Sequence, residues 1–171
     1  MVYYVSSFLN KMKQKIINPY RNGYNHSYKN KDCPFCNEKI LKRQAIPDLE
    51  NNHWHILVNY YPYLDGNIMI VSKRHLLNIS SLTAEEWGSL QNMIKQTQKL
   101  LTKIFKTESF NIGINIGPYS GATVKHLHWQ IIPRMAEVKN GGVINLLSGL
   151  QIIKISPQEL KERIIKANRE E

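Results

Sequence analysis

The sequence predicts one α+β domain in which antiparallel β-strands pack against a long α-helix. Two segments rich in aromatic and β-branched residues, 53–60 and 67–72, flank a short turn and are expected to form an antiparallel hairpin. A capped segment with helical periodicity follows them. Beyond it, segments 109–117 and 126–133 alternate between apolar and polar or small residues, as half-buried strands do. These patterns together favour a sheet with a helix on one face.

The hairpin is predicted from its turn as well as from its strands. Pro62 and the Asp65-Gly66 pair lie between the two segments and supply the residues that reverse a chain. The segment before the hairpin, which follows Cys36 and contains Pro47, is expected to be rich in loops.

The long helix is predicted to begin after Thr83, because Thr83 and Glu86 have the spacing of a capping box. Its apolar residues recur at helical spacing, with Thr97 in the one gap, and we interpret them as core rather than as a cofactor site. They are Trp87, Leu90, Ile94, Leu101, Ile104 and Phe105. A last helix is predicted after Ser156, a cap residue followed by Pro157 at the first helical position.

Length and composition limit the class of protein. A chain of 171 residues suffices for one domain with a sizeable core, and 42% hydrophobic residues is typical of a globular protein rather than of a disordered one. No apolar run reaches the roughly 18 residues of a membrane span. Lysines interrupt the N-terminal segment where a signal peptide would be apolar. We therefore expect a cytoplasmic protein that does not enter a membrane.

The net charge of +10 is concentrated near the N-terminus, where the first 32 residues hold six lysines and arginines against Asp32 alone. We divide the chain into a basic N-terminal arm, 1–31, and a catalytic domain, 32–171. A basic segment attracts phosphate groups of many kinds. Either the arm is simply solvated, or it contacts nucleic acid.

Cys33 and Cys36 are the only two cysteines, too few for a disulfide framework in a chain of this size. Their C-x-x-C spacing suits one metal ion or a redox pair. A redox pair of the thioredoxin type follows a strand, whereas the charged residues 29–32 precede this one. The sequence therefore favours a metal.

The segment 126–133 carries the chemistry that we consider most informative. Alternation along a strand places His126, His128 and Gln130 on one face, while Leu127 and Trp129 point to the other. A register shift by one residue would exchange these faces, so the polar face is well specified.

Residues before this strand are expected to form an anion-binding loop beside it. Asn115 lies on the preceding strand, whose glycines leave room for a ligand near the backbone. The loop then offers backbone N–H groups and hydroxyls. Its expected phosphate-binding residues are Gly121, Ala122, Thr123 and Val124. The sequence contains no P-loop signature, which excludes that class of nucleotide-binding fold.

Taken in order, these segments resemble the histidine-triad (HIT) superfamily over residues 33–134. The matching segments are Cys33–Cys36, Asn59–Asn67, Lys73–His75, Gly113–Gly117 and His126–Gln130. The resemblance implies a HIT-like fold, with an antiparallel sheet of about five strands and a long helix packed on it. It also implies a homodimer.

The resemblance assigns roles to several residues. His128 corresponds to the family histidine that attacks the α-phosphate of a nucleotide and forms a nucleotidyl-histidine intermediate. An imidazole with a pKa near about 6.5 has a free-base nitrogen available at neutral pH. Gln130 is expected to hold phosphate oxygens, and Asn59 and Asn115 match positions that contact the nucleotide.

The resemblance also implies a structural zinc ion. Family members with C-x-x-C bind zinc through the two cysteines, the histidine after the second strand and the first histidine of the last motif. Here the ligands would be Cys33, Cys36, His75 and His126, a complete tetrahedral set.

The sequence departs from the family pattern at two positions. Gln130 replaces a third histidine found in many family hydrolases and is similar to the phosphorylase and uridylyltransferase branches. Asn67 replaces another family histidine and cannot carry a proton. We therefore expect a nucleotide hydrolase or transferase, with the acceptor open between water and phosphate. The alternatives are a hydrolase that processes nucleic-acid ends and a zinc-stabilised nucleotide-binding module without turnover.

Overall fold

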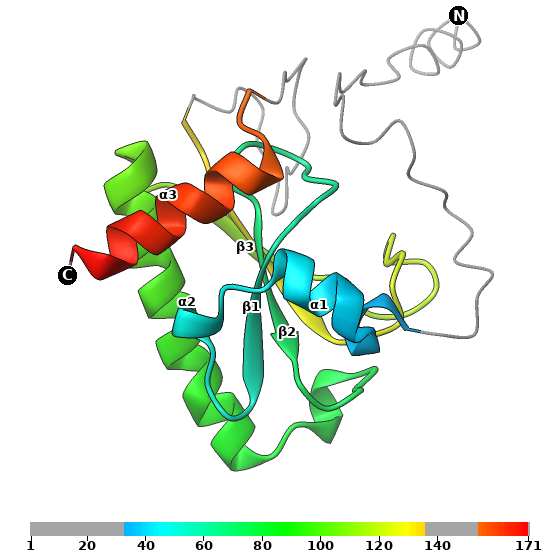
Figure 1. The fold of residues 1–171 in the computed structure, drawn as a ribbon. Helices are drawn as coiled ribbons and strands as arrows, with labels where there is room; N and C mark the ends of the chain where they lie inside the picture. Colours follow the sequence, from blue (N-terminus) through cyan, green and yellow to red (C-terminus); the bar gives the residue numbers. More distant parts are fainter. Residues whose placement is uncertain (1–32, 136–153, 171) are drawn as a thin grey trace, which may run out of the picture.

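The computed structural model describes residues 33–135 and 154–170, which form an α+β domain with a sheet covered on both faces (Figure 1). The basic arm predicted over residues 1–31 lies outside the described residues. Within them, no helix is long and apolar enough to cross a membrane.

The sheet consists of β1 (Trp54–Val58), β2 (Ile68–Ser72), β3 (Phe110–Ile114) and β4 (His128–Pro133). Its strand order is β1-β2-β4-β3, and all three neighbouring pairs are antiparallel. The predicted hairpin is the β1–β2 pair. The α+β class and the antiparallel sheet are therefore confirmed.

The sheet has four strands in the described residues, not about five as expected. The chain approaches the free edge of β1 at Ala45, where it makes a single bridge to Leu57. The next backbone N–H, that of Ile46, donates to the carbonyl of Ile56. Pro47 follows and has no N–H to continue a ladder, so the chain turns into a short 3₁₀-helix, Pro47–Leu49, instead of forming an edge strand.

The long helix α2 (Ala84–Phe105) begins where the sequence predicts, with Thr83 and Glu86 forming the reciprocal capping box. The predicted buried stripe is partly wrong. Trp87 is 45% exposed, because the buried face is rotated toward Leu90, Met93 and Leu101. Met93 and Leu100 fill core positions that the sequence prediction left out.

Two shorter helices complete the fold. α3 (Pro157–Arg169) is capped by Ser156 as predicted and packs on α2. α1 (Glu38–Gln44) occupies part of the segment expected to be rich in loops. Asn37 caps α1 by accepting hydrogen bonds from the N–H groups of Lys39 and Ile40, which is the local signal for this helix.

Each face of the sheet has its own apolar core. On one face, Trp54, Trp129 and Ile131 pack with residues of α2 and α3. On the other, Phe35 and Met69 belong to a smaller cluster near α1. In Figure 1, α2 and α3 lie together on one side of the strands and α1 on the other. The smaller cluster leaves room for polar side chains on its face of the sheet.

The hairpin turn supplies a test of the packing. Gly66 has a φ of +79°, and a Cβ atom there would lie 2.5 Å from Cγ of Pro133 and 2.7 Å from Cε2 of Phe105. Gly66→Ala is expected to lower the free energy of unfolding by about 2–4 kcal/mol, from backbone strain and overpacking together. Urea denaturation measures this change.

Gly88→Ala is the matched control. Gly88 lies within α2, and a Cβ atom there would have no neighbour within 4 Å. This substitution should raise the free energy of unfolding by about 0.5–1 kcal/mol, the difference in helix propensity. Equal effects of the two substitutions would contradict the packing described for Gly66.

Candidate active site and metal centre

Strand β4 positions His128 and Gln130 on the same face of the sheet as the smaller core. In the register with β2, His128 pairs with Val71 and Gln130 pairs with Met69, both members of that core. Trp129 instead points to the opposite core. The predicted alternation of the two faces is therefore present in the structure.

One detail of the predicted strand is wrong. The strand begins at His128, and His126 precedes it, so His126 belongs to the loop rather than to the ladder. The face that carries His128 and Gln130 is buried, since His128 is only 9% exposed and Gln130 8%. The segment with Phe35 covers it, and Phe35 makes edge contacts with the rings of both His126 and His128.

The imidazole of His128 is held in one tautomer. Its Nδ1 lies 2.7 Å from the backbone carbonyl of His126, an acceptor, so Nδ1 carries the hydrogen and donates it. Burial lowers the pKa of His128 below its usual value, which favours the neutral ring. Nε2 therefore keeps its lone pair.

A chain of three buried carboxamides fixes the orientation of Gln130. Asn59 Nδ2 donates to Asn67 Oδ1 at 2.8 Å, and Asn67 Nδ2 donates to Gln130 Oε1 at 2.7 Å. Asn59 Oδ1 accepts a hydrogen bond from the N–H of Tyr61, which fixes the orientation of the first of the three carboxamides. Since the oxygen of Gln130 is used in this way, its NH₂ group remains as a donor.

A pocket lies between α1 and this face of the sheet. It combines predicted site residues with aromatic, aliphatic and polar residues from the segments on either side. The pocket is lined by Pro34, Phe35, Ile40, Arg43, Gln44, Asn59, Tyr61, Tyr63, Met69, Thr123, Val124, His128 and Gln130. The structure thus brings together five of the predicted site residues.

Three predicted residues do not line this pocket: Asn115, Gly121 and Ala122. They lie in the connection between β3 and β4, where a Cβ atom on Gly121 would be 4.0 Å from Nδ2 of Asn115. Gly121 has a φ of +82°, and the N–H of Ala122 donates to Oγ of Ser120 within the same turn. These contacts shape the loop that carries Thr123 and Val124.

Sequence reasoning missed the residues that α1 and the turn after β1 contribute to the pocket. Gln44 is 5% exposed at the end of α1, and Tyr61 and Tyr63 lie in the hairpin turn. The sequence signal for α1 was the Asn37 cap followed by apolar residues at positions 40 and 41. Nothing in the local pattern placed Gln44 beside the edge of β1, at one end of this pocket.

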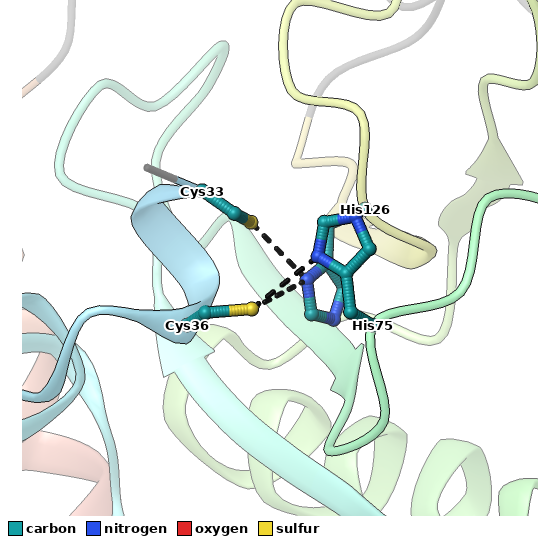
Figure 2. Close-up of side chains that lie close together, drawn as sticks. All are labelled: Cys33, Cys36, His75 and His126. Carbon is teal, nitrogen blue, oxygen red and sulfur yellow. Dashed lines mark hydrogen bonds between the residues drawn. The ribbon is translucent and has the colours of Figure 1, made fainter. Parts of the chain in front are cut away.

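The four predicted metal ligands converge at one point (Figure 2). All of their ligand atoms lie within 4.8 Å of one another. The Sγ of Cys33 is 3.3 Å from Nδ1 of His126, that of Cys36 is 3.3 Å from Nδ1 of His75, and Cys36 Sγ is 3.6 Å from Nδ1 of His126. Tetrahedral bonds of about 2.3 Å to sulfur and about 2.0–2.1 Å to nitrogen place such atoms about 3.6 Å apart. The four residues are therefore positioned as a possible metal site.

The electrostatics of this cluster also suit a cation. Nε2 of His126 donates to the carbonyl of Ser72 at 2.7 Å, which leaves Nδ1 as the free-base atom facing the sulfurs. Burial lowers the pKa of His126 to about 4 and raises that of Cys33 to about 11. The imidazole is thus a neutral ligand, whereas the thiol needs a nearby positive charge to ionise.

An ion pair ties the segment carrying His75 to the start of α2. Nε of Arg74 lies 2.7 Å from Oε1 of Glu86, and its NH2 nitrogen 2.8 Å from Oε2. The hydrogen bond from Arg74, with that from the backbone N–H of Thr83, lowers the pKa of Glu86 to about 2, although burial acts in the opposite direction. Glu86 therefore caps the helix and anchors the metal-ligand segment with one carboxylate.

Comparison with known proteins agrees with this geometry. A family model described as "HIT domain" matches residues 40–137. The chain is 28% identical over 107 residues to a Mycobacterium tuberculosis protein named AP-4-A phosphorylase, covering 62% of this chain and 52% of the relative. It is 35% identical over 77 residues to the Schizosaccharomyces pombe bis(5'-nucleosyl)-tetraphosphatase [asymmetrical], covering 45% and 42%. The chain spans about half the length of these relatives.

Solved structures share the fold at lower sequence identity. A zinc-bound histidine triad family protein from Mycobacterium smegmatis aligns with a TM-score of 0.61 and 17% identity, over 81% of this chain and 94% of that one. Since the HIT model covers more than half of its residues, this chain belongs to the HIT domain family.

The carboxamide chain provides a test of the site's geometry. Asn67→Leu removes the central member, which is fully buried, and leaves the NH₂ of Asn59 and the oxygen of Gln130 without partners. Two unpaired buried polar groups should lower the free energy of unfolding by about 2–4 kcal/mol. Chemical denaturation of the purified variant measures this loss.

Asn92→Leu is the matched control, because Asn92 is exposed on α2. It should change the stability by less than about 0.5 kcal/mol. If Asn67→Leu also lowered the free energy of unfolding by less than about 0.5 kcal/mol, the hydrogen bonds among the three carboxamides would not contribute to stability as described.

Proposed function

We propose that the protein is a nucleotide hydrolase or transferase that acts at the α-phosphate of a nucleoside polyphosphate or nucleotide conjugate. The observation that carries this proposal is the state of His128. Its Nδ1 is committed to the His126 carbonyl, and its ring lines a pocket beside the NH₂ group of Gln130. A positioned, neutral imidazole next to a hydrogen-bond donor suits attack on a phosphorus atom.

In the first step, the lone pair on Nε2 of His128 forms a bond to the α-phosphorus. The bond between that phosphorus and the bridging oxygen breaks, and its electron pair leaves with the departing phosphate chain. The ring gains positive charge, and the Nδ1–H bond to the His126 carbonyl stabilises it. In the second step, an acceptor oxygen attacks the same phosphorus and releases His128.

The NH₂ group of Gln130 donates to a phosphate oxygen as charge develops there. Because the Asn67 hydrogen bond fixes the Gln130 oxygen, this donor needs no reorientation during the reaction. A carboxamide cannot protonate a leaving group. The proposal therefore restricts good leaving groups to those stable as anions, such as the phosphate chain of a dinucleoside polyphosphate.

Two names among the relatives support this substrate class: AP-4-A phosphorylase and bis(5'-nucleosyl)-tetraphosphatase [asymmetrical]. The first favours phosphate over water as the acceptor in this chain, as does the glutamine at position 130. With diadenosine tetraphosphate as substrate, we expect turnover to accelerate when inorganic phosphate is added. Labelled phosphate should then appear in the nucleoside diphosphate product.

The covalent step is tested by trapping. Wild-type protein mixed with a nucleotide labelled at the α-phosphorus and quenched in base should retain label, because a phosphorus–nitrogen bond to imidazole is stable in base and labile in acid. His128→Ala should retain none, and its turnover should fall by about 10³-fold or more. Label retention is measured by mass spectrometry of the intact chain.

His53→Ala is the matched control for this experiment. His53 pairs with Glu85 and does not line the pocket, so the adduct should form as in wild type. An equally labelled His128→Ala protein, or a wild-type protein that turns over without any trapped adduct, would rule out the covalent route.

We also propose that the four-residue cluster binds one zinc ion in a structural role. Two thiols and two imidazoles form a complete tetrahedral donor set, and soft sulfur ligands favour zinc over magnesium or calcium. Bound zinc would join the segment of Cys33 and Cys36 to His75 and to the loop before β4. The cluster lies beside His128 rather than in the pocket, so the role of the ion is to hold His126.

Metal analysis tests this assignment. Wild-type protein should contain about one zinc ion per chain, and Cys36→Ser should contain close to none. Since metal binding is linked to folding, the variant and chelator-treated wild type should both melt at lower temperature. His53→Ala should keep its zinc, and a full zinc content in Cys36→Ser would refute the ligand set.

A further inference from the structure

Gln44 is a buried polar side chain in the pocket wall that nothing above has assigned. Gln44 is 5% exposed, and its side-chain oxygen, Oε1, is buried without a hydrogen-bond partner among the described residues. Burying an unpaired carboxamide costs free energy, and polar groups in such places are normally satisfied. Other atoms of the Gln44 side chain line the pocket, so a ligand there can supply the missing partner once the carboxamide rotates toward it.

The strand register places Gln44 at the end of the pocket opposite His128 and Gln130. Ala45, the next residue, bridges to Leu57 on β1. Leu57 pairs with Met69 on β2, and Met69 pairs with Gln130 on β4. These three inter-strand steps of roughly 4.8 Å separate the backbones of Ala45 and Gln130 by about 14 Å.

This separation assigns the two ends of the pocket to different parts of a nucleotide. The inference rests on the proposed function, in which the α-phosphate lies at His128 and Gln130. The end near α1 then receives the part of the nucleotide farthest from the phosphate, which is the base. Ile40 and Phe35 supply apolar surface for the faces of a planar ring, and Gln44 supplies the polar group.

We propose that Gln44 is a specificity-determining residue that recognises the hydrogen-bonding edge of the nucleobase. Its carboxamide offers one acceptor beside one donor. Adenine presents the complementary pair, a 6-amino donor beside a ring-nitrogen acceptor, and glutamine pairs with adenine in this bidentate way in other settings. The base edge thereby satisfies the oxygen of Gln44 that has no partner in the protein.

Nearby charges do not compete for this role. Arg43, adjacent in α1, holds its guanidinium over the ring of Tyr60, 4.4 Å from the centroid. Among the residues that line the pocket there is no carboxylate. Recognition at this end therefore depends on neutral hydrogen bonds, which discriminate by the presence or absence of one group on the base.

The test compares two ligands and two variants of the full chain by calorimetric titration. The ligands are AMP and purine riboside 5'-monophosphate, which lacks only the 6-amino group. Wild type should bind AMP about five- to tenfold more tightly than the analogue, the effect of one buried hydrogen bond. Gln44→Leu should bind both ligands equally, because it cannot pair with either base edge.

A second measurement separates recognition from a structural role. Gln44→Leu removes an unpaired buried polar group, so the ligand-free variant should melt at the same temperature as wild type or higher. A residue that holds the fold together would instead lower the melting temperature. Gln91→Leu, the same substitution on the exposed face of α2, should leave both the ligand preference and the melting temperature unchanged.

The outcomes distinguish this proposal from the one on which it rests. If wild type binds both ligands and Gln44→Leu keeps the wild-type ratio, the role of Gln44 is refuted while the nucleotide pocket stands. If wild type binds neither ligand and forms no adduct at His128, the proposed function and the role of Gln44 both fail. Loss of the preference for AMP in a stable Gln44→Leu protein supports the assignment.

Discussion

One residue, His126, connects the cluster of two cysteines and two histidines to the imidazole of His128. Its Nδ1 faces the sulfur atoms, its Nε2 donates to the carbonyl of Ser72, and its own carbonyl accepts the Nδ1 hydrogen of His128. The side chain of His126 is thus fixed from two directions, and its backbone selects the tautomer of its neighbour. The state of the cluster and the availability of Nε2 on His128 therefore depend on the same backbone position.

Much of the fold was predictable because its signals are local. The capping box at Thr83, the alternation around Trp129 and the turn at Gly66 each depend on a few consecutive residues, and all three are present, although the strand of Trp129 begins two residues later than predicted. The missing fifth strand has an equally local cause in Pro47. The buried face of α2 was harder to predict. Both Trp87 and Met93 fit an apolar stripe at helical spacing, and only tertiary packing determines which of them is buried.

The residues of the site that belong to a motif or to the family resemblance could be predicted from the sequence. The other residues of the pocket could not. Cys36 and His126 are 90 residues apart, and the structure brings them to 3.6 Å, as the resemblance implied. Gln44 had no such signal. A polar residue at the end of a short helix is usually exposed, and its burial results from packing against the β1 edge. The part of the pocket to which we assign ligand discrimination is thus the part least visible in the sequence.

The two departures from the family pattern, Asn67 and Gln130, are explained together by their hydrogen bond. Two imidazoles at these positions would titrate near neutral pH, and protonation of one would disfavour protonation of the other. Carboxamides do not titrate, so the NH₂ donor of Gln130 keeps its orientation across this range. What the site loses is a proton for the leaving group. In the proposed reaction, this pair of residues suits the cleavage of phosphoanhydrides, whose leaving groups depart as anions, and offers no proton with which to expel a basic alkoxide or amine.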